Sequence, residues 1–330
     1  MSPKKAMKAM LHCARAQRPF FLWGSPGIGK SSMVYQMAAV LGRKVTEIRA
    51  VLLDPVDLRG IPSIVDGRTV WCPPVFLPTG SGWILFIDEL NSAPLLVQAA
   101  LYQLILDRKL GEYELPPDCI IVAAGNRETD RAVTTRMPSA LANRFVHIDV
   151  QVHMGDWTDW ALPKGIRLEV IAFLRMRPQL LFDFDPKRND KAFATPRSWE
   201  FVGDLLEVFD GNPNEMDVLH GLIAGTVGDA VATEFMGFLE VWRKLPNPDR
   251  VIDDPDKFDV PKEPAVLFAL CGALARKAND QNMANIIKFA ERMRVEFMMA
   301  LVLDAVKRNQ KVAETRAYIT WAAKNNVTLV

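Results

Sequence analysis

The residues with the most definite chemistry lie between positions 24 and 31. There the sequence reads Gly-Ser-Pro-Gly-Ile-Gly-Lys-Ser, which matches the phosphate-loop pattern G-x-x-x-x-G-K-[ST] at every fixed position. Glycines let a backbone wrap closely enough around phosphate oxygens for several N–H groups to point at them. Lys30 is then expected to reach the β- and γ-phosphates, and the Ser31 hydroxyl to ligate Mg²⁺. The expected binding residues are Gly24, Ser25, Pro26, Gly27, Ile28, Gly29, Lys30, Ser31 and Ser32.

The segments on either side of this loop support the motif. Phe20–Trp23 is apolar and has the pattern of a buried strand, and residues 32–41 have a helical pattern that Gly42 ends. A helix that begins directly after the loop contributes further N–H donors and a partial positive charge. The alternative, a glycine-rich turn that matches by chance, is disfavoured by these flanking elements.

Two acidic residues end the next apolar run. Residues 83–87 are apolar and Asp88 and Glu89 follow, which indicates a buried parallel strand with carboxylates at its carboxyl end. Ligands of open α/β sheets bind at that end. We expect Asp88 to hold Mg²⁺ and Glu89 to orient or activate an attacking water. In the alternative, both acids cap the helix that starts near Asn91.

A third polar strand end completes the candidate site. Residues 119–125 form another buried strand pattern, and Asn126 follows, where its amide is expected to hold the water or the γ-phosphate. Further strand patterns at 44–49 and 145–149 bring the total to five. The expected fold is therefore α/β, with a five-stranded parallel sheet flanked by helices, among them 3–18 and 94–107.

Two segments interrupt this alternation. Residues 53–79 contain several prolines and a hairpin signal, Asp66-Gly67, between short β-prone runs, and we favour a functional insertion over a surface hairpin without a role. A second, shorter hairpin is expected at 108–116, with Gly111 at its centre.

Composition bounds the class of protein. The chain has 330 residues, of which 49% are hydrophobic and 24% charged, and its net charge is +1. This length favours two domains, which we place at 1–150 and 151–330. The neutral charge argues against a dedicated nucleic-acid binder. Because the four cysteines form no C-x-x-C pair, and because no signal peptide or membrane span is evident, we expect a cytoplasmic protein.

The second half of the chain has helical patterns throughout. One long amphipathic helix is expected over 283–307, and an extended, proline-rich connection over 246–264. Residues 210–330 are expected to be an extension of the helical domain. No catalytic constellation is visible there, and the four dispersed histidines predict no metal site.

The order of these parts resembles the AAA+ ATPase module. The phosphate loop, the Asp88-Glu89 strand end, Asn126 and the Arg144-Phe145 pair are similar to Walker A, Walker B, sensor 1 and the arginine finger, and Arg197 lies in a segment similar to sensor 2. The two insertions resemble those of the branch with MoxR-type ATPases, magnesium chelatase subunits, McrB and dynein. Asp57-Leu-Arg-Gly60 and Leu141-Ala-Asn-Arg-Phe145 most resemble the MoxR type, which includes CbbQ and NorQ.

This resemblance implies an ATPase that works as a homo-oligomeric ring, usually a hexamer, with ATP and Mg²⁺ bound between subunits. Its catalytic residues are then Lys30, Glu89, Asn126 and Arg144, with Arg144 acting on the neighbouring subunit's nucleotide. Arg131 and Arg136 are rivals for that role. Arg197 is implied to contact its own subunit's nucleotide from a helical lid, or else to be a surface charge of a lid helix.

The resemblance also implies a function, in which ATP hydrolysis remodels or activates a separate partner protein in the manner of a chaperone, commonly one with a von Willebrand factor A domain. The segment Ile61–Leu77 is our candidate for contact with that substrate. One alternative is a nucleic-acid-associated motor similar to McrB, and another is a scaffold that binds ATP and barely hydrolyses it. No membrane association is expected.

Overall fold

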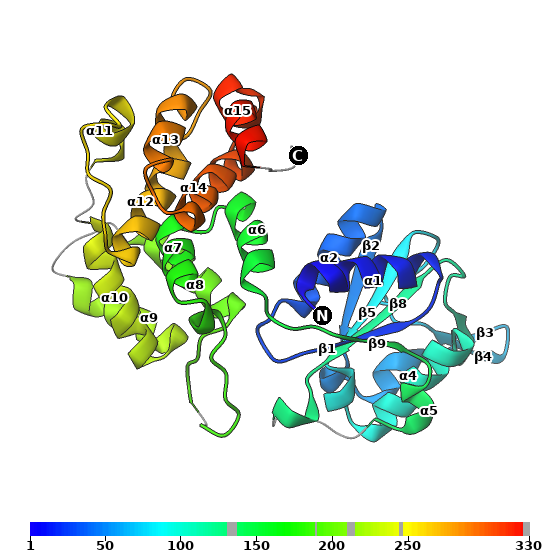
Figure 1. Cartoon of the computed structure of the whole chain (residues 1–330). Coiled ribbons are helices and arrows are strands. Elements are labelled where there is room, and N and C mark those ends of the chain that lie inside the picture. Colours follow the sequence, from blue (N-terminus) through cyan, green and yellow to red (C-terminus); the bar gives the residue numbers. More distant parts are fainter. Residues whose placement is uncertain (131–136, 189, 210–214, 244–246, 326–330) are drawn as a thin grey trace. The chain divides into compact units, whose positions relative to one another are not determined.

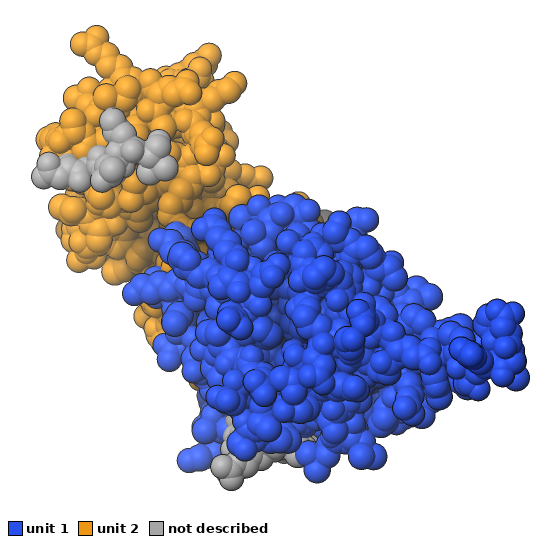
Figure 2. Space-filling model, turned by 90° about the vertical axis from the view of Figure 1, so that its right-hand side faces the viewer, with its two compact units in different colours: residues 1–153, 185–189 blue, residues 154–184, 190–330 orange. Residues whose placement is uncertain are grey.

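A computed structural model of the chain describes residues 1–130, 137–188, 190–209, 215–243 and 247–325. The chain divides into two compact units, coloured blue and orange in Figure 2. The first comprises residues 1–153 and 185–189, and the second comprises residues 154–184 and 190–330. Each unit is described by itself below.

The first unit is built on a five-stranded sheet in the order β2-β5-β8-β1-β9. Every neighbouring pair in this sheet is parallel, which confirms the predicted fold class. Parallel strands all end at the same edge, so the residues that follow β1, β5 and β8 meet there. The strands are β1 Phe20–Trp23, β2 Lys44–Arg49, β5 Trp83–Asp88, β8 Ile120–Gly125 and β9 Val146–Asp149.

Helices cover both faces of this sheet (Figure 1). Successive side chains of a strand point to opposite faces, so the apolar runs of β5 and β8 supply a core on each side. Phe21, Leu85 and Ile121 belong to the core that packs against the helix after β5. The helices of this unit are α1 Pro3–Arg15, α2 Lys30–Leu41, α3 Pro55–Arg59, α4 Leu95–Asp107 and α5 Ser139–Ala142, with short 3₁₀ turns η1 Ala50–Leu52, η2 Leu90–Ser92 and η3 Glu128–Asp130.

Both predicted hairpins are present. Strands β3 Ile61–Val65 and β4 Arg68–Cys72 pair antiparallel across a turn in which Asp66 and Gly67 both have positive φ. That is the backbone that an Asp-Gly turn favours. The shorter hairpin pairs β6 Lys109–Leu110 with β7 Tyr113–Glu114.

The two hairpins are joined by side chains. The Trp71 N–H donates to Glu112 Oε2 at 3.3 Å, and the Tyr113 hydroxyl donates to the Pro78 carbonyl at 2.6 Å. Both insertions therefore form one connected region of the first unit.

The second unit is helical in its described part. Its core includes Leu274, Phe289, Leu301 and Trp321, from four different helices. Its elements are α6 Met154–Lys164, α7 Leu168–Met176, η4 Pro178–Leu181, α8 Pro196–Val208, α9 Met216–Val227, α10 Asp229–Arg243, α11 Pro248–Asp253, α12 Pro264–Lys277, α13 Met283–Ala290, α14 Val295–Arg308, η6 Gln310–Glu314 and α15 Arg316–Lys324.

Two predictions for this unit were wrong. The single helix expected over 283–307 is two helices, because Arg294 adopts an extended conformation between α13 and α14. This segment contains neither glycine nor proline, so its local sequence gave no sign of the break. Within the connection expected at 246–264, α11 forms because Asn247 caps Asp249 N and because Val251 and Ile252 are buried. None of the described helices is long and apolar enough to cross a membrane.

Candidate nucleotide-binding site

The phosphate loop connects the end of β1 to the start of α2, and its glycines serve different needs. Gly27 and Gly29 have φ of 76° and 94°, a backbone conformation that residues with a Cβ rarely adopt. Space is short at Gly24 instead, since a Cβ there would lie 3.1 Å from the Val150 carbonyl oxygen and 2.3 Å from Ile28 Cδ1, which would have to shift. The loop is therefore compact and follows the backbone that the motif predicts.

Lys30 is the first residue of α2, and its side chain turns back over the loop. Its ammonium group donates to the carbonyls of Gly24 at 2.6 Å and Ser25 at 3.1 Å, and to Asn126 Oδ1 at 2.9 Å. The N-cap of α2 is Gly29, which has no side chain to occupy the first N–H groups of the helix. A lysine beside uncapped helical N–H groups fits a phosphate group.

Ser31 and Asp88 are brought together from different elements. The Ser31 hydroxyl donates to Asp88 Oδ2 at 3.3 Å, and Asp88 Oδ1 accepts the N–H of Glu89 at 2.9 Å. A hydroxyl and a carboxylate suit Mg²⁺, which prefers oxygen ligands and keeps several waters or phosphate oxygens. Bound there, Mg²⁺ would neutralise charge on the phosphates.

Glu89 lies in a turn directly beyond β5. Its φ of 55° is left-handed, which is unusual for a residue with a side chain, and such positions cluster at functional sites. In the alternative reading the acids cap the helix that starts near Asn91. Glu89 does stand at the N-cap position of η2, but its side chain makes no capping hydrogen bond there, and the N-cap of α4 is Pro94. Glu89 is half-buried at the same sheet edge as Asp88 and Asn126.

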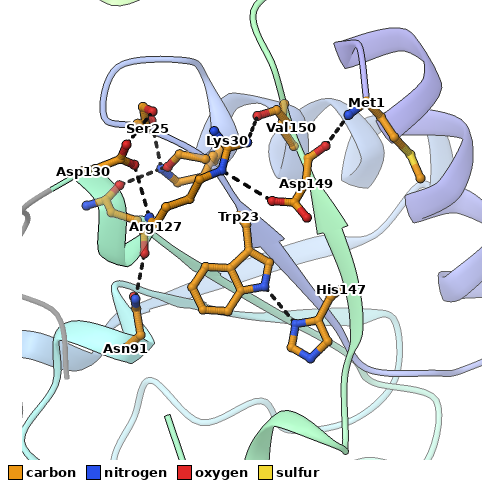
Figure 3. A network of polar contacts seen from close by, with 12 residues as sticks. Met1, Trp23, Ser25, Lys30, Asn91, Arg127, Asp130, His147, Asp149 and Val150 are labelled. Carbon is orange, nitrogen blue, oxygen red and sulfur yellow. Dashed lines mark hydrogen bonds and ion pairs between the residues drawn. The ribbon is translucent and has the colours of Figure 1, made fainter. Parts of the chain in front are cut away.

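Asn126 joins the end of β8 to the phosphate loop. Its side-chain oxygen accepts the bond from Lys30, and its main-chain carbonyl accepts a hydrogen bond from Asn91 Nδ2 at 2.8 Å (Figure 3). The structure thus gathers Lys30, Ser31, Asp88 and Asn126 from three elements into one site.

Sequence reasoning missed three residues of this network, namely Asn91, Arg127 and Asp130. Asp130 Oδ1 accepts the Ser25 hydroxyl at 3.1 Å, and Asp130 Oδ2 accepts the Arg127 N–H at 3.2 Å (Figure 3). Arg127 also donates to the Val150 carbonyl at 3.0 Å. Their proximity to Glu89 and Asn126 in the sequence was the available signal.

The candidate arginines are placed differently. Arg144 follows α5 and is exposed, so within one chain it remains accessible. Arg131 and Arg136 lie outside the described residues. Arg197 lies in the first turn of α8, in the second unit, where Thr195 and Ser198 form a capping box. The roles of all four stay predictions.

A pair of aromatic side chains links the loop to the segment that carries Arg144. Trp23 Nε1 donates to His147 Nδ1 at 2.8 Å (Figure 3), and His147 Nε2 lies 2.8 Å from the Ala142 carbonyl. An indole N–H can only donate and a carbonyl can only accept, so these partners make Nδ1 of His147 the acceptor and Nε2 the donor. The end of β1 is thereby connected to the last turn before Arg144.

One side chain near the acids has a perturbed pKa. The Tyr35 hydroxyl, on α2, donates to Glu47 Oε2 at 2.7 Å. That hydrogen bond, with burial and with the charges of Glu47 and Asp88, raises the pKa of Tyr35 to about 12. The raised pKa keeps the Tyr35 hydroxyl protonated as a donor to Glu47 even in alkaline solution, where a tyrosine with an ordinary pKa would ionise.

Comparison with known proteins agrees with this geometry. Residues 19–145 match the family model described as AAA domain (dynein-related subfamily). Protein NorQ of Paracoccus denitrificans is 31% identical over 140 residues, which cover 40% of this chain and 52% of NorQ. Midasin of Giardia intestinalis is 30% identical over 157 residues, which cover 45% of this chain and 3% of Midasin. The chain therefore spans only part of each relative.

Solved structures show weaker likeness. A mutant of RuvB from Thermotoga maritima has a TM-score of 0.41 at 18% identity, covering 82% of this chain and 80% of that one. NtrX of Brucella abortus has a TM-score of 0.44 at 15% identity, covering 92% and 67%. Such values carry no argument about function.

The matched segment, residues 19–145, carries this site and is similar to the AAA domains of the dynein-related subfamily. The similarity to NorQ over 140 residues agrees with the resemblance to MoxR-type ATPases that the sequence motifs indicate.

The contacts of Lys30 generate a prediction about nucleotide binding. Lys30→Ala removes a charged donor from the phosphate position, and a hydrogen bond to a charged group contributes about 1.5–3 kcal/mol. We expect ATP to bind roughly 10- to 100-fold more weakly. Titration of a fluorescent ATP analogue measures this, with exposed Lys8→Ala as the control. Equal affinity of both variants would contradict the assignment.

Proposed function

We propose that this protein is a Mg²⁺-dependent ATPase that assembles into a homo-oligomeric ring, a hexamer, and uses hydrolysis to remodel or activate a partner protein. The observation that carries the proposal is the meeting of Lys30, Ser31, Asp88 and Asn126 at one edge of a parallel sheet, with Glu89 beside them. These are the residue types that phosphoryl transfer to water requires.

Each side chain has a part in the proposed reaction. Lys30 binds the β- and γ-phosphates, and Ser31 and Asp88 hold Mg²⁺. Glu89 orients the attacking water and accepts its proton, while Asn126 positions that water against the γ-phosphate.

The proposed ring follows from Arg144. Phosphoryl transfer gains strongly from an arginine that neutralises the transition state. Arg144 is exposed in the single chain, which suits a residue that acts on a neighbour's nucleotide. We further propose that residues 151–330 are the helical lid with its extension, and that Arg197 contacts the nucleotide from there.

The proposed contact with a partner uses the larger insertion. Of the 20 exposed large apolar side chains in the described part of the chain, six fall within this insertion, residues 53–79. Among them are Ile61 and Ile64 of β3, exposed by 74% and 82%. Exposed apolar groups gathered in one region indicate an interaction site. We propose a separate protein with a von Willebrand factor A domain as the partner, since MoxR-type ATPases commonly act with such proteins.

Assembly is tested with Glu89→Gln. This variant keeps the site's shape but loses the carboxylate, so it should bind ATP, hydrolyse it at least about 100-fold more slowly, and remain assembled. Light scattering after size-exclusion chromatography should show a ring-sized species with ATP and Mg²⁺. If the variant stays monomeric under saturating ATP, the proposed ring is wrong.

The role of Arg144 is tested by mixing two inactive variants. Arg144→Ala should bind ATP without hydrolysing it. Lys30→Ala should bind ATP roughly 10- to 100-fold more weakly, so its own site stays largely empty at an ATP concentration that fills the Arg144→Ala site. In a mixed ring, an Arg144→Ala subunit has an intact Lys30 and can receive Arg144 from a Lys30→Ala neighbour. ATPase activity should therefore return on mixing. Arg144→Ala hydrolysing at the wild-type rate, or mixtures without activity, would exclude action between subunits.

The insertion is tested by replacing an exposed apolar residue. Ile64→Ser should leave basal ATPase activity unchanged and reduce, by about tenfold, binding to a purified von Willebrand factor A domain protein of the same organism. Val40→Ser is the matched control, since Val40 is exposed by 68% but lies on α2. Equal loss in both variants would argue against the insertion as the contact.

A further inference from the structure

Asn91 is a buried polar residue that the proposed reaction does not use. It lies in η2, two residues after Glu89, and its exposed fraction is 2%. Buried amides usually have all their polar atoms paired. In the described part of the chain, the Oδ1 atom of Asn91 is buried without a hydrogen-bond partner. Burying this oxygen costs free energy that an apolar side chain would avoid.

The other half of the amide makes one specific contact. Asn91 Nδ2 donates to the main-chain carbonyl of Asn126 at 2.8 Å. The side chain lies directly against the preceding residue as well, because a Cβ built on Gly125 would come within 2.0 Å of Asn91 Oδ1. The backbone of Gly125 and Asn126 is thus held against Asn91 at van der Waals distance.

The hydrogen bond from Asn91 connects the β5 side of the sheet to β8 beyond the last backbone pair of these two strands. The last paired residues of β5 and β8 are Ile87 and Ala123, so no backbone ladder joins Asp88 to the residues before Asn126. On its other side, the end of β8 is held by the Gly24 N–H, which donates to the Gly125 carbonyl at 3.4 Å. Asn91 thus holds the carboxyl end of β8 from the β5 side of the sheet, opposite β1.

The anchoring of β8 by Asn91 affects the proposed reacting groups through Asn126. Its carbonyl is fixed by Asn91, while its side-chain oxygen accepts from Lys30 at 2.9 Å. Asn91 belongs to the turn that follows Glu89, and the Glu89 carbonyl accepts the Ser92 N–H at 2.9 Å. One amide therefore ties the turn after the acids to the residue proposed to position the water.

We propose that Asn91 is a positioning residue for ATP hydrolysis, which holds Asn126 in register with Glu89. The inference rests on the proposed function. Asn91 contacts the backbone of Gly125 and Asn126, so its loss should affect the geometry of the chemical step and leave the phosphate loop intact. Small displacements of a catalytic group cost up to about 100-fold in rate.

The test compares Asn91→Ala with a matched control, Gln98→Ala. Gln98 on α4 is also a buried amide, exposed by 1%, whose Nε2 donates to a main-chain carbonyl, that of Ala93, at 2.9 Å. Its Oε1 is likewise buried without a partner among the described residues. Both variants should lose similar stability in thermal unfolding. Only Asn91→Ala should lower kcat, by roughly 10- to 100-fold, with ATP affinity within about threefold of wild type.

A double-mutant cycle separates positioning from packing. If Asn91 acts through Asn126, kcat of the double variant Asn91→Ala with Asn126→Ala should equal that of Asn126→Ala alone. If the loss of kcat in the double variant is the product of the two single losses, the two residues act independently and the proposal is wrong. An equal loss of kcat in Gln98→Ala would also overturn it. Should Asn91→Ala fail to fold, Asn91→Leu fills a similar volume without the donor and is expected to show the same loss of kcat.

The two levels of inference fail in different ways. A wild-type chain that binds ATP without hydrolysing it in any assembly would remove the proposed function. A hydrolysing wild type with an equally active, folded Asn91→Ala would remove only the role of Asn91.

Discussion

The site depends on one adjacency, that of β1 beside β8 in a parallel sheet. This pairing places the phosphate loop next to Asn126, and the Lys30 ammonium is shared between loop carbonyls and the Asn126 side chain. The parallel direction then requires β5 to deliver Asp88 and Glu89 to the same edge. Groups separated by about a hundred residues thus meet without a dedicated scaffold.

Side chains beyond the motif hold these strand ends together. Asp130 is bonded to Ser25 of the loop, Arg127 to the carbonyl after β9, and Asn91 to the carbonyl after β8. Each contact lies where backbone pairing has stopped. Backbone ladders fix the strands, whereas polar side chains fix the irregular ends on which the proposed chemistry relies.

The helical unit obeys a different constraint. With no sheet to set its geometry, its helices are bounded by how their apolar faces fit a common core. Arg294 separates α13 from α14 so that Phe289 and Phe297 are both buried, although nothing in the local sequence breaks the helix. The same packing orders α11 inside a proline-rich connection through Val251 and Ile252.

The sequence alone determined the elements with strong local signals. Apolar runs predicted the buried strands, and the glycines with Lys30 and Ser31 predicted the phosphate loop. Asp66-Gly67 predicted the β3–β4 turn. Each pattern reflects a local requirement of backbone conformation or burial. Tertiary structure alone decided the partners: that Asn91 bonds Asn126, that Asp130 reaches Ser25, and that the helix expected over 283–307 is broken. These depend on contacts between segments distant in the chain, and no local pattern encodes which carbonyl a buried amide will face.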